Sequence, residues 1–253
     1  MDRVIIKSSG EPTYRLPDIA YHRDKFDRNF DVIVDVFGAD HMDAYPDVIA
    51  AIKSLDYDSD KIKVLIHQFV TVLKNGEPVK MSTRKANFIS LDSLIDEVGA
   101  DVTRFFFIMR SMNTHLNFDL DLAKEQSDAN PVFYIQYAHA RCCNMLRRFE
   151  SDLDSIDESS LEHLKLDIET QLINKLLTFP EVIRKSSQTL EPQNISNYLA
   201  ELASSFHSYY AKERVIDSDN KILTEARIYL VNATRIVIRN GLKILGVSAP
   251  EQM

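Results

Sequence analysis

The chain has 253 residues, of which 45% are hydrophobic and 27% are charged, as is ordinary for a soluble globular protein. These proportions exclude a collagen-like, low-complexity or acidic disordered chain. A formal net charge of −8 excludes a basic field over the whole molecule, although a local basic stripe could still bind RNA. No apolar stretch approaches the roughly 20 residues of a membrane span, and the N-terminus lacks the pattern of a signal peptide. The two cysteines, Cys142 and Cys143, are neighbours that suit neither a disulfide nor a zinc site, so we expect a reducing, cytoplasmic setting.

The first 75 or so residues predict an α/β unit. Strand-length runs of β-branched and apolar residues at 31–37 and 64–73 alternate with helical patterns at 17–30 and 43–55, and a short strand is expected at 4–7. Because a strand–helix–strand unit makes a crossover, the two longer strands should pair in parallel. Two or three strands are too few to complete a doubly wound sheet. We therefore expect this segment to be the rear of a larger α/β domain.

Glycine usage predicts helices in the second half. The chain has six glycines, against the roughly 18 of average usage, and none lies between Gly99 and Gly241. Hairpins usually need Gly or Asn at their turns, so this stretch favours helices. A turn at 74–78 and a polar, basic loop at 79–87 lead to a predicted helix at 91–110. A bundle of about five helices should follow, at 131–149, 161–179, 181–190, 195–215 and 222–245.

The loop Lys80-Met-Ser-Thr-Arg84-Lys85 places three cations and two hydroxyls directly after a predicted strand. Such a loop can reach polyphosphate and neutralise the charge that develops in phosphoryl or nucleotidyl transfer. On charge alone, a solvated surface loop is the commoner explanation. In context, however, the loop resembles the KMSKS signature of class I aminoacyl-tRNA synthetases, and the segments 79–88 and 91–107 are similar to arginyl-tRNA synthetases.

Further segments that resemble this family lie in order on both sides of the loop. They are LPDIAYHRDK from Leu16, GADH at Gly38–His41, HLNFDLD from His115, YIQYAHAR from Tyr134, and the C-terminal LGVSAPEQM, which resembles the natural end of the family. The resemblance therefore covers nearly the whole chain.

This resemblance implies a mainly α fold with an α/β part, in which an incomplete Rossmann-like catalytic half precedes an all-α helix-bundle anticodon-binding domain. The expected boundaries are 1–78 for the rear half of the class I catalytic domain, 79–125 for the KMSKS-type loop and connecting helices, and 126–253 for the anticodon-binding domain.

The resemblance implies that Tyr14 and Asp18 hold the arginine side chain. The chemistry agrees, because a carboxylate binds a guanidinium through two parallel hydrogen bonds that lysine cannot reproduce. The alternative for Asp18 is a carboxylate that only stabilises the start of a helix.

Gly38, Asp40 and His41 end a predicted strand, where open α/β sheets bind their ligands. The resemblance implies that Gly38 lets ATP approach, that Asp40 binds its ribose and that His41 lines the same pocket. A simple turn at the end of a strand is the alternative.

In the loop, the resemblance implies catalytic roles for Lys80, Ser82 and Arg84 and an ATP contact from Met81. Thr83 replaces the second lysine of the signature, and Ala86 stands where the family commonly has glycine, which restricts the loop if that position needs a positive φ. ATP is expected with Mg²⁺ as the substrate complex, with no tightly bound cofactor and no metal site in the protein.

Two aromatic–basic clusters in the helical half suit stacking on single-stranded bases. They are Tyr134, Tyr137, His139 and Arg141, and Phe206, Tyr209, Tyr210 and Arg214. The last predicted helix has Arg227, Arg235, Arg239 and Lys243 on one face, which could follow phosphates. Among these residues we expect tRNA contacts from Tyr137, Arg141, Tyr209, Arg214, Arg235 and Arg239. The alternatives are an aromatic core and a solvated basic face; the two cysteines should be thiols of the helix core.

The resemblance implies the C-terminal part of an enzyme that joins L-arginine to tRNA(Arg) through an arginyl-adenylate. The second class I signature, HIGH, is not found around any of the seven histidines. We therefore expect the chain alone to be inactive, and its partners to be tRNA(Arg), L-arginine, ATP and the missing N-terminal half of the catalytic domain, with no membrane. The alternatives are a non-catalytic tRNA-binding paralogue and a helical interaction module.

Overall fold

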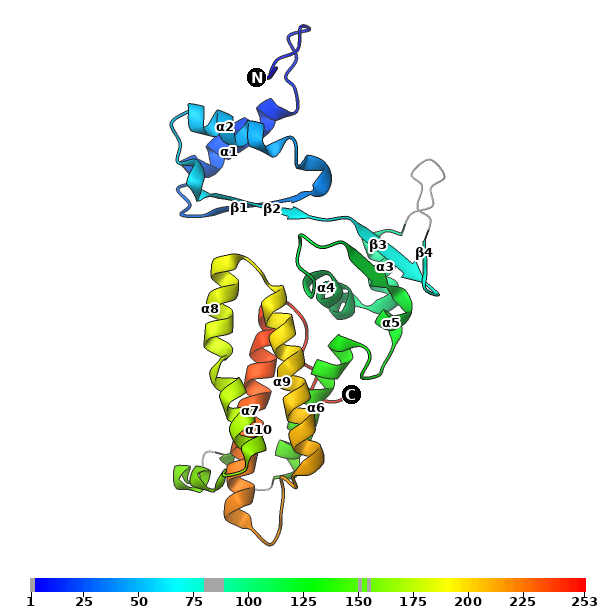
Figure 1. The fold of residues 1–253 in the computed structure, drawn as a ribbon, viewed down its shortest axis with the longest axis vertical. Coiled ribbons are helices and arrows are strands. Elements are labelled where there is room, and N and C mark those ends of the chain that lie inside the picture. Colours follow the sequence, from blue (N-terminus) through cyan, green and yellow to red (C-terminus); the bar gives the residue numbers. More distant parts are fainter. Residues whose placement is uncertain (1–2, 80–88, 150–151, 154–155) are drawn as a thin grey trace. The chain divides into compact units, whose positions relative to one another are not determined.

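The computed structural model describes residues 3–79, 89–149, 152–153 and 156–253 (Figure 1). The chain divides into two compact units, one of Met1–Thr71 with Met112–Leu116 and the other of Val72–Ser111 with Asn117–Met253. Among the described helices, none is both long and apolar enough to cross a membrane.

The first unit packs two helices on a parallel pair of strands (Figure 1). Its elements are α1 (Arg15–Asp27), β1 (Ile33–Gly38), the short 3₁₀ turn η1 (Ala39–His41), α2 (Tyr45–Ser54), the 3₁₀ turn η2 (Ser59–Lys61) and β2 (Ile62–His67). The strands are in register from Ile33 opposite Ile62 to Gly38 opposite His67. The predicted parallel crossover is therefore confirmed.

A small apolar core joins these elements. It consists of Ile19, Ile33, Val48, Ile52 and Ile62, contributed by α1, α2 and both strands. Side chains alternate between the faces of a strand, so Val34 and Val36 on β1 point away from this core and are 43% and 58% exposed. Apolar residues on both faces are typical of strands in a parallel sheet that is covered on both sides.

The run 64–73, predicted as one strand, is two strands, because the backbone changes partner after β2 ends. The N–H of Gln68 donates to the carbonyl of Met112 at 2.9 Å, and the carbonyl of Phe69 accepts from Leu116 at 3.3 Å. The next strand, β3 (Val70–Lys74), lies between β4 (Glu77–Pro78) and β5 (Leu116–Asp119). The strand predicted at 4–7 is wrong, because among the described residues this segment makes only an isolated bridge from Ile6 to Pro12.

The second unit begins with short helices. They are α3 (Leu91–Val98), α4 (Ala100–Ile108) and α5 (Leu120–Lys124). The single helix predicted at 91–110 is wrong, because Gly99 adopts a φ of 88° and a ψ of 157° that no helix contains. The strand β5 was not expected from the sequence.

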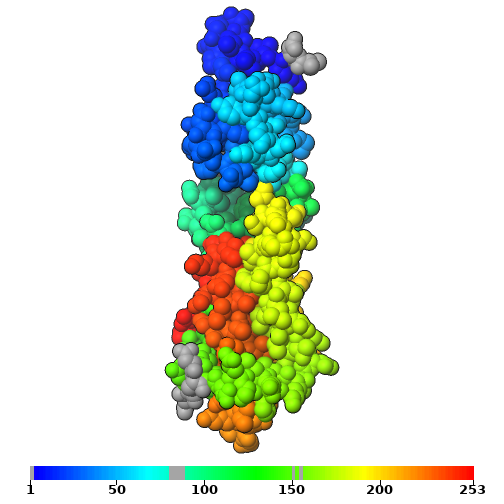
Figure 2. Space-filling view, turned by 90° about the vertical axis from the view of Figure 1, so that its left-hand side faces the viewer, coloured from blue at the N-terminus to red at the C-terminus, as the bar shows by residue number. Residues whose placement is uncertain are grey.

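A bundle of five helices follows, as predicted (Figure 1). The described helices are α6 (Pro131–Arg148), α7 (Asp167–Leu177), α8 (Phe179–Thr189), α9 (Gln193–Lys212) and α10 (Lys221–Ile244), with a 3₁₀ segment, η5 (Glu158–His163), before α7. Within this unit, Figure 2 shows α10 in orange and red beside the yellow-green α7 and α8. Asn130 caps α6 by accepting from the N–H groups of Val132 and Phe133, with Pro131 at the first helical position.

The long helices α6, α9 and α10 enclose the apolar interior of the bundle. Cys142 and Cys143 are buried there, which confirms their prediction as core thiols. Burial raises the pKa of both thiols. At Gly241 of α10, an added Cβ would lie 2.6 Å from Cδ2 of Leu199, so the close approach of α9 and α10 requires glycine.

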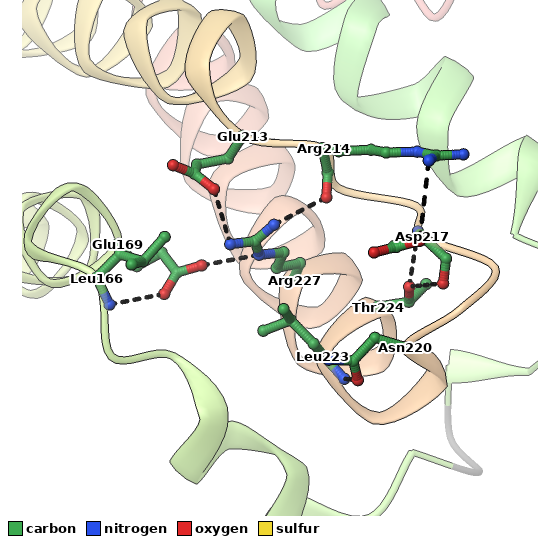
Figure 3. A network of polar contacts seen from close by, with 9 residues as sticks. All are labelled: Leu166, Glu169, Glu213, Arg214, Asp217, Asn220, Leu223, Thr224 and Arg227. Atoms are coloured by element: carbon green, nitrogen blue, oxygen red, sulfur yellow. Dashed lines mark hydrogen bonds and ion pairs between the residues drawn. The ribbon is translucent and has the colours of Figure 1, made fainter.

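A buried ionic network joins α7, the end of α9 and α10 (Figure 3). Arg227 donates from Nε to Glu169 Oε1 at 2.8 Å, from Nη2 to Glu213 Oε2 at 2.9 Å and from Nη1 to the carbonyl of Arg214 at 2.9 Å. Arg227 is 6% exposed and Glu169 is fully buried. Arg227 therefore does not belong to the exposed basic face that the helical spacing predicted.

Candidate functional site

The two residues expected to bind arginine lie at the start of α1. Tyr14 immediately precedes the helix and Asp18 lies in its first turn, so a spacing of four residues puts both on one face. Both side chains are exposed. Among the described residues, the Asp18 carboxylate has no hydrogen-bond or ion-pair partner, while its carbonyl accepts from Nδ1 of His22 at 2.8 Å. The Tyr14 hydroxyl and the Asp18 carboxylate are therefore both available to a guanidinium.

The residues expected to bind ATP lie at the carboxyl end of β1, with Gly38 as its last residue and Asp40 and His41 in the turn that follows. An added Cβ at Gly38 would lie 2.6 Å from Oδ1 of Asp40, so glycine leaves room for this carboxylate beside the strand end. The ring of His41 stacks on Phe37 with 5.7 Å between centroids, and its Nε2 lies 3.8 Å from Oδ2 of Asp40. Asp40 and His41 are both exposed at this end of the sheet.

A buried ionic cluster that was not predicted from the sequence joins β1 to α1. Asp35 of β1 is 7% exposed; its Oδ2 lies 2.6 Å from Nε2 of His22, and its Oδ1 pairs with Nζ of Lys25. Burial raises the pKa of Asp35, but hydrogen bonds from Lys25 and His22 together lower it further, so the net pKa lies below its ordinary value. The cluster joins the helix that carries Asp18 to the strand that ends at Gly38.

A sequence signal for this cluster exists. Asp35 interrupts the apolar run DVIVDVF at a position that faces the core, and a buried carboxylate needs cationic or hydrogen-bonding partners. By contrast, Lys80, Met81, Ser82 and Arg84 lie outside the described residues, and their roles stay predictions.

In the second unit, Tyr137 and Arg141 of α6 and Tyr210 of α9 line a cavity of about 410 Å³. The segment 247–253, here called the C-terminal tail, contributes its last three residues to the lining. Cζ of Arg141 lies 4.5 Å from the ring centroids of both tyrosines. Its Nη2 donates to the hydroxyl of Tyr137 at 2.8 Å, and its Nη1 lies 3.1 Å from Nδ1 of His207.

The cavity is basic and continues into a second hollow. Arg147 and Arg148 also line it, and Glu251 is the acidic side chain among its lining residues. An adjoining cavity of about 300 Å³ shares Arg148 and Tyr210 with the first and reaches Arg214, whose side chain is exposed. Cationic and aromatic groups thus gather on one surface, which suits a single-stranded nucleic acid.

The other residues expected to contact tRNA lie elsewhere. Tyr209 is fully buried, and burial raises its pKa. Successive helical residues point about 100° apart, so Tyr210 faces the cavity while its neighbour Tyr209 packs in the core. Arg235 is half-buried and donates to Oδ1 of Asn232, and Arg239 is exposed. Neither Arg235 nor Arg239 lines the described cavities.

Comparison with known proteins matches the whole chain to two families. Residues 1–138 match the family described as tRNA synthetases class I (R), catalytic domain, and residues 135–253 match the DALR anticodon binding domain. Over its full length the chain is 55% identical to the arginine–tRNA ligase of Chlorobium limicola and 52% identical to that of Salinibacter ruber. It spans 46% and 45% of these two proteins, which is about half their length.

Solved structures agree. A structure from Campylobacter jejuni assigned as an arginyl-tRNA synthetase is 32% identical, with a TM-score of 0.90 over 100% of this chain and 55% of that one. The Thermus thermophilus arginyl-tRNA synthetase, at 21% identity, shares the fold with a TM-score of 0.84 over 99% of this chain and 51% of its own. The chain therefore belongs to the arginyl-tRNA synthetase family of class I tRNA synthetases.

Proposed function

We propose that the helical bundle binds the anticodon of tRNA(Arg) in the cavity between Tyr137 and Tyr210. The observation that carries this proposal is the pairing of two tyrosine rings with Arg141, Arg147 and Arg148 around one cavity. Aromatic faces stack on unpaired bases, and guanidinium groups neutralise phosphate or stack on bases themselves. Tyr209 and Arg227 are left out of this surface because both are buried.

We propose that the first unit contributes the arginine and nucleotide contacts of an arginine–tRNA ligase. Asp18 would accept two hydrogen bonds from the substrate guanidinium, with the Tyr14 hydroxyl beside it. Gly38, Asp40 and His41 would contact ATP, which reacts as its Mg²⁺ complex. Lys80, Met81, Ser82 and Arg84 would act on the triphosphate as the arginine carboxylate attacks it, giving arginyl-adenylate and pyrophosphate before transfer to tRNA.

This activity is proposed for a complete catalytic domain, of which the chain is one part. The chain spans 46% of the length of its Chlorobium limicola relative. We expect little arginine-dependent exchange between ATP and pyrophosphate from the 253-residue chain alone. Brisk exchange by this chain would contradict that expectation.

The test of RNA binding compares two exposed tyrosines. Tyr210 lines the cavity and is 38% exposed, while Tyr229 on α10 is 42% exposed and lies outside it. Tyr210→Ala should weaken binding of the tRNA(Arg) anticodon stem-loop roughly 5- to 150-fold, the range expected for one stacked base. Tyr229→Ala should leave the Kd within about twofold of wild type. Equal effects of the two substitutions, measured by fluorescence anisotropy, would overturn the assignment of the cavity.

A further inference from the structure

The C-terminal tail leaves α10 through a fixed turn. Gly246 has a φ of 69°, its N–H donates to the carbonyl of Lys243 at 3.0 Å, and the N–H of Val247 donates to Leu242 at 2.9 Å. This pair of hydrogen bonds is a Schellman motif, which reverses the chain at the end of a helix. An added Cβ at Gly246 would lie 3.2 Å from the side chain of Arg104, so α4 packs directly against the turn. The turn and its contact with Arg104 therefore fix the direction in which the tail leaves α10.

Just after this turn, Asp101 of α4 and Gln136 of α6 hold Ser248. Oδ1 of Asp101 accepts from the N–H of Ser248 at 3.1 Å, and its Oδ2 accepts from the Ser248 hydroxyl. Nε2 of Gln136 donates both to Oδ2 of Asp101 and to the carbonyl of Ser248, each at 3.0 Å. We call these three residues the Asp101 clasp. Gln136 is 9% exposed, so its amide has few competing water contacts.

Two further hydrogen bonds carry the tail along α6 to the cavity. Nδ1 of His139 donates to the carbonyl of Pro250 at 2.8 Å, and both Nη atoms of Arg147 donate to the carbonyl of Glu251 at 3.3 Å. These bonds are made to backbone atoms, so they fix the path of the tail whatever its side chains are. The path ends at Glu251, Gln252 and Met253, which form one wall of the Tyr137–Tyr210 cavity.

We propose that Asp101 and Gln136 are positioning residues for RNA binding, because they hold the C-terminal tail as a preformed wall of this cavity. The proposal rests on the proposed function of the cavity. The last residues of a domain are ordinarily poorly ordered unless they are tied down. A wall that is already ordered does not have to lose its conformational entropy when the ligand binds, so the clasp raises affinity without touching the RNA.

A matched pair of carboxylates tests the proposal. Asp101 and Asp92 are each the second residue of a helix, in α4 and α3, so Asp101→Ala and Asp92→Ala remove the same charge from the same helical position. Two readouts are needed: the rate at which carboxypeptidase releases Met253 from the tail, and the Kd for the tRNA(Arg) anticodon stem-loop. Ser248→Ala is a milder variant at an exposed site outside the helices, in case Asp101→Ala does not fold.

The proposal expects Asp101→Ala to speed the release of Met253 and to raise the Kd for the stem-loop about fivefold. A fivefold change corresponds to the net contribution of about one hydrogen bond. Ser248→Ala should change both readouts in the same direction, and Asp92→Ala should change neither. If the clasp variants loosen the tail but leave the Kd unchanged, or do not loosen it, the positioning role is wrong while the function of the cavity stands. If the wild-type chain does not bind the stem-loop, the proposed function fails and the binding role fails with it, whereas the protease rates still report whether the clasp holds the tail.

Discussion

At the scale of single residues, the carboxylate of Asp35 shows how α1 is attached to the sheet. Its two oxygens contact His22 and Lys25, which lie about one turn apart on α1. A buried charge that loses its partners keeps its desolvation cost without compensation. The cluster therefore specifies the rotation of α1, and with it the direction in which Asp18 points.

This cluster predicts a particular dependence of stability on pH. The pKa of Asp35 in the folded chain lies below its ordinary value of 3.8, because Lys25 and His22 bind its ionised form. Ionised Asp35 therefore stabilises the fold above a pH of about 3.8, and this contribution is lost as the pH falls below that value. Asp35→Asn should lower the free energy of unfolding by roughly 3 kcal/mol at neutral pH. The difference from wild type should narrow below a pH of about 3.8.

Urea unfolding across this pH range measures the effect, with Asp31→Asn as the control because Asp31 is exposed just before the same strand. A difference between wild type and Asp35→Asn that stays constant down to strongly acidic pH would contradict the assigned ion pairs.

The placement of Asp18 at the start of a helix and of Asp40 just after a strand could be predicted from the sequence, because both positions follow from local patterns. The binding roles of these residues stay predictions. The burial of Tyr209 and Arg227 could not be predicted. Both lie on helices with polar and apolar residues close together, and which side of such a helix faces inward is decided by the helices that pack against it. Tyr209 and Tyr210 are the same residue type on the same helix and differ only in the direction in which they point from the helix axis.

At the scale of elements, Gly99 decides that α3 and α4 are two helices. The apolar spacing continues through this position, which is why the sequence predicted a single helix. Its φ of 88° with a ψ of 157° is open to glycine and strained for other residues. The break turns α4 so that Asp101 holds Ser248 of the C-terminal tail and Arg104 lies beside Gly246, just before the tail.

Substitution at Gly99 isolates this backbone requirement. No atom lies within 4 Å of an added Cβ there among the described residues, so Gly99→Ala introduces no clash. The cost should be backbone strain alone, and we expect the free energy of unfolding to fall by about 1–3 kcal/mol. Thermal and urea unfolding of the purified chain would measure it. An unchanged stability would mean that α3 and α4 tolerate a different junction.

The helices of the bundle were predictable because each has a long apolar period and clear ends, such as Asn130 and Pro131 before α6. The strand β5 was not, since it has four residues and its partner β3 lies more than forty residues earlier in the chain. Pairing of this kind depends on tertiary structure, and a run as short as Leu116–Asp119 has too few residues to show a period.

At the scale of the whole molecule, the two units differ in the size of their apolar interiors. The core of the first unit has five buried apolar residues, whereas α9 alone contributes seven buried apolar or aromatic residues to the bundle. Local stability follows the number of buried apolar contacts. The units should therefore open separately, and the first unit should open more easily.

Hydrogen exchange followed by mass spectrometry tests this difference. Amides of β1 and β2 should exchange at least about tenfold faster, after correction for intrinsic rates, than amides in the middle of α9 and α10. Equal protection of the strands and the bundle helices would show that the chain unfolds as one cooperative body.

The guanidinium of Arg141 already lies over the rings of Tyr137 and Tyr210, 4.5 Å from each centroid. Each such cation–π contact contributes about 0.5–2 kcal/mol, and more as its groups are removed from water. A nucleobase that stacks on the same ring faces must displace this guanidinium. The measured affinity is therefore the free energy of base stacking less the free energy of the cation–π contacts that the base replaces. The displaced guanidinium of Arg141 would then be free to pair with a phosphate of the RNA. The same side chain would thus cover the tyrosine rings before binding and neutralise a phosphate afterwards.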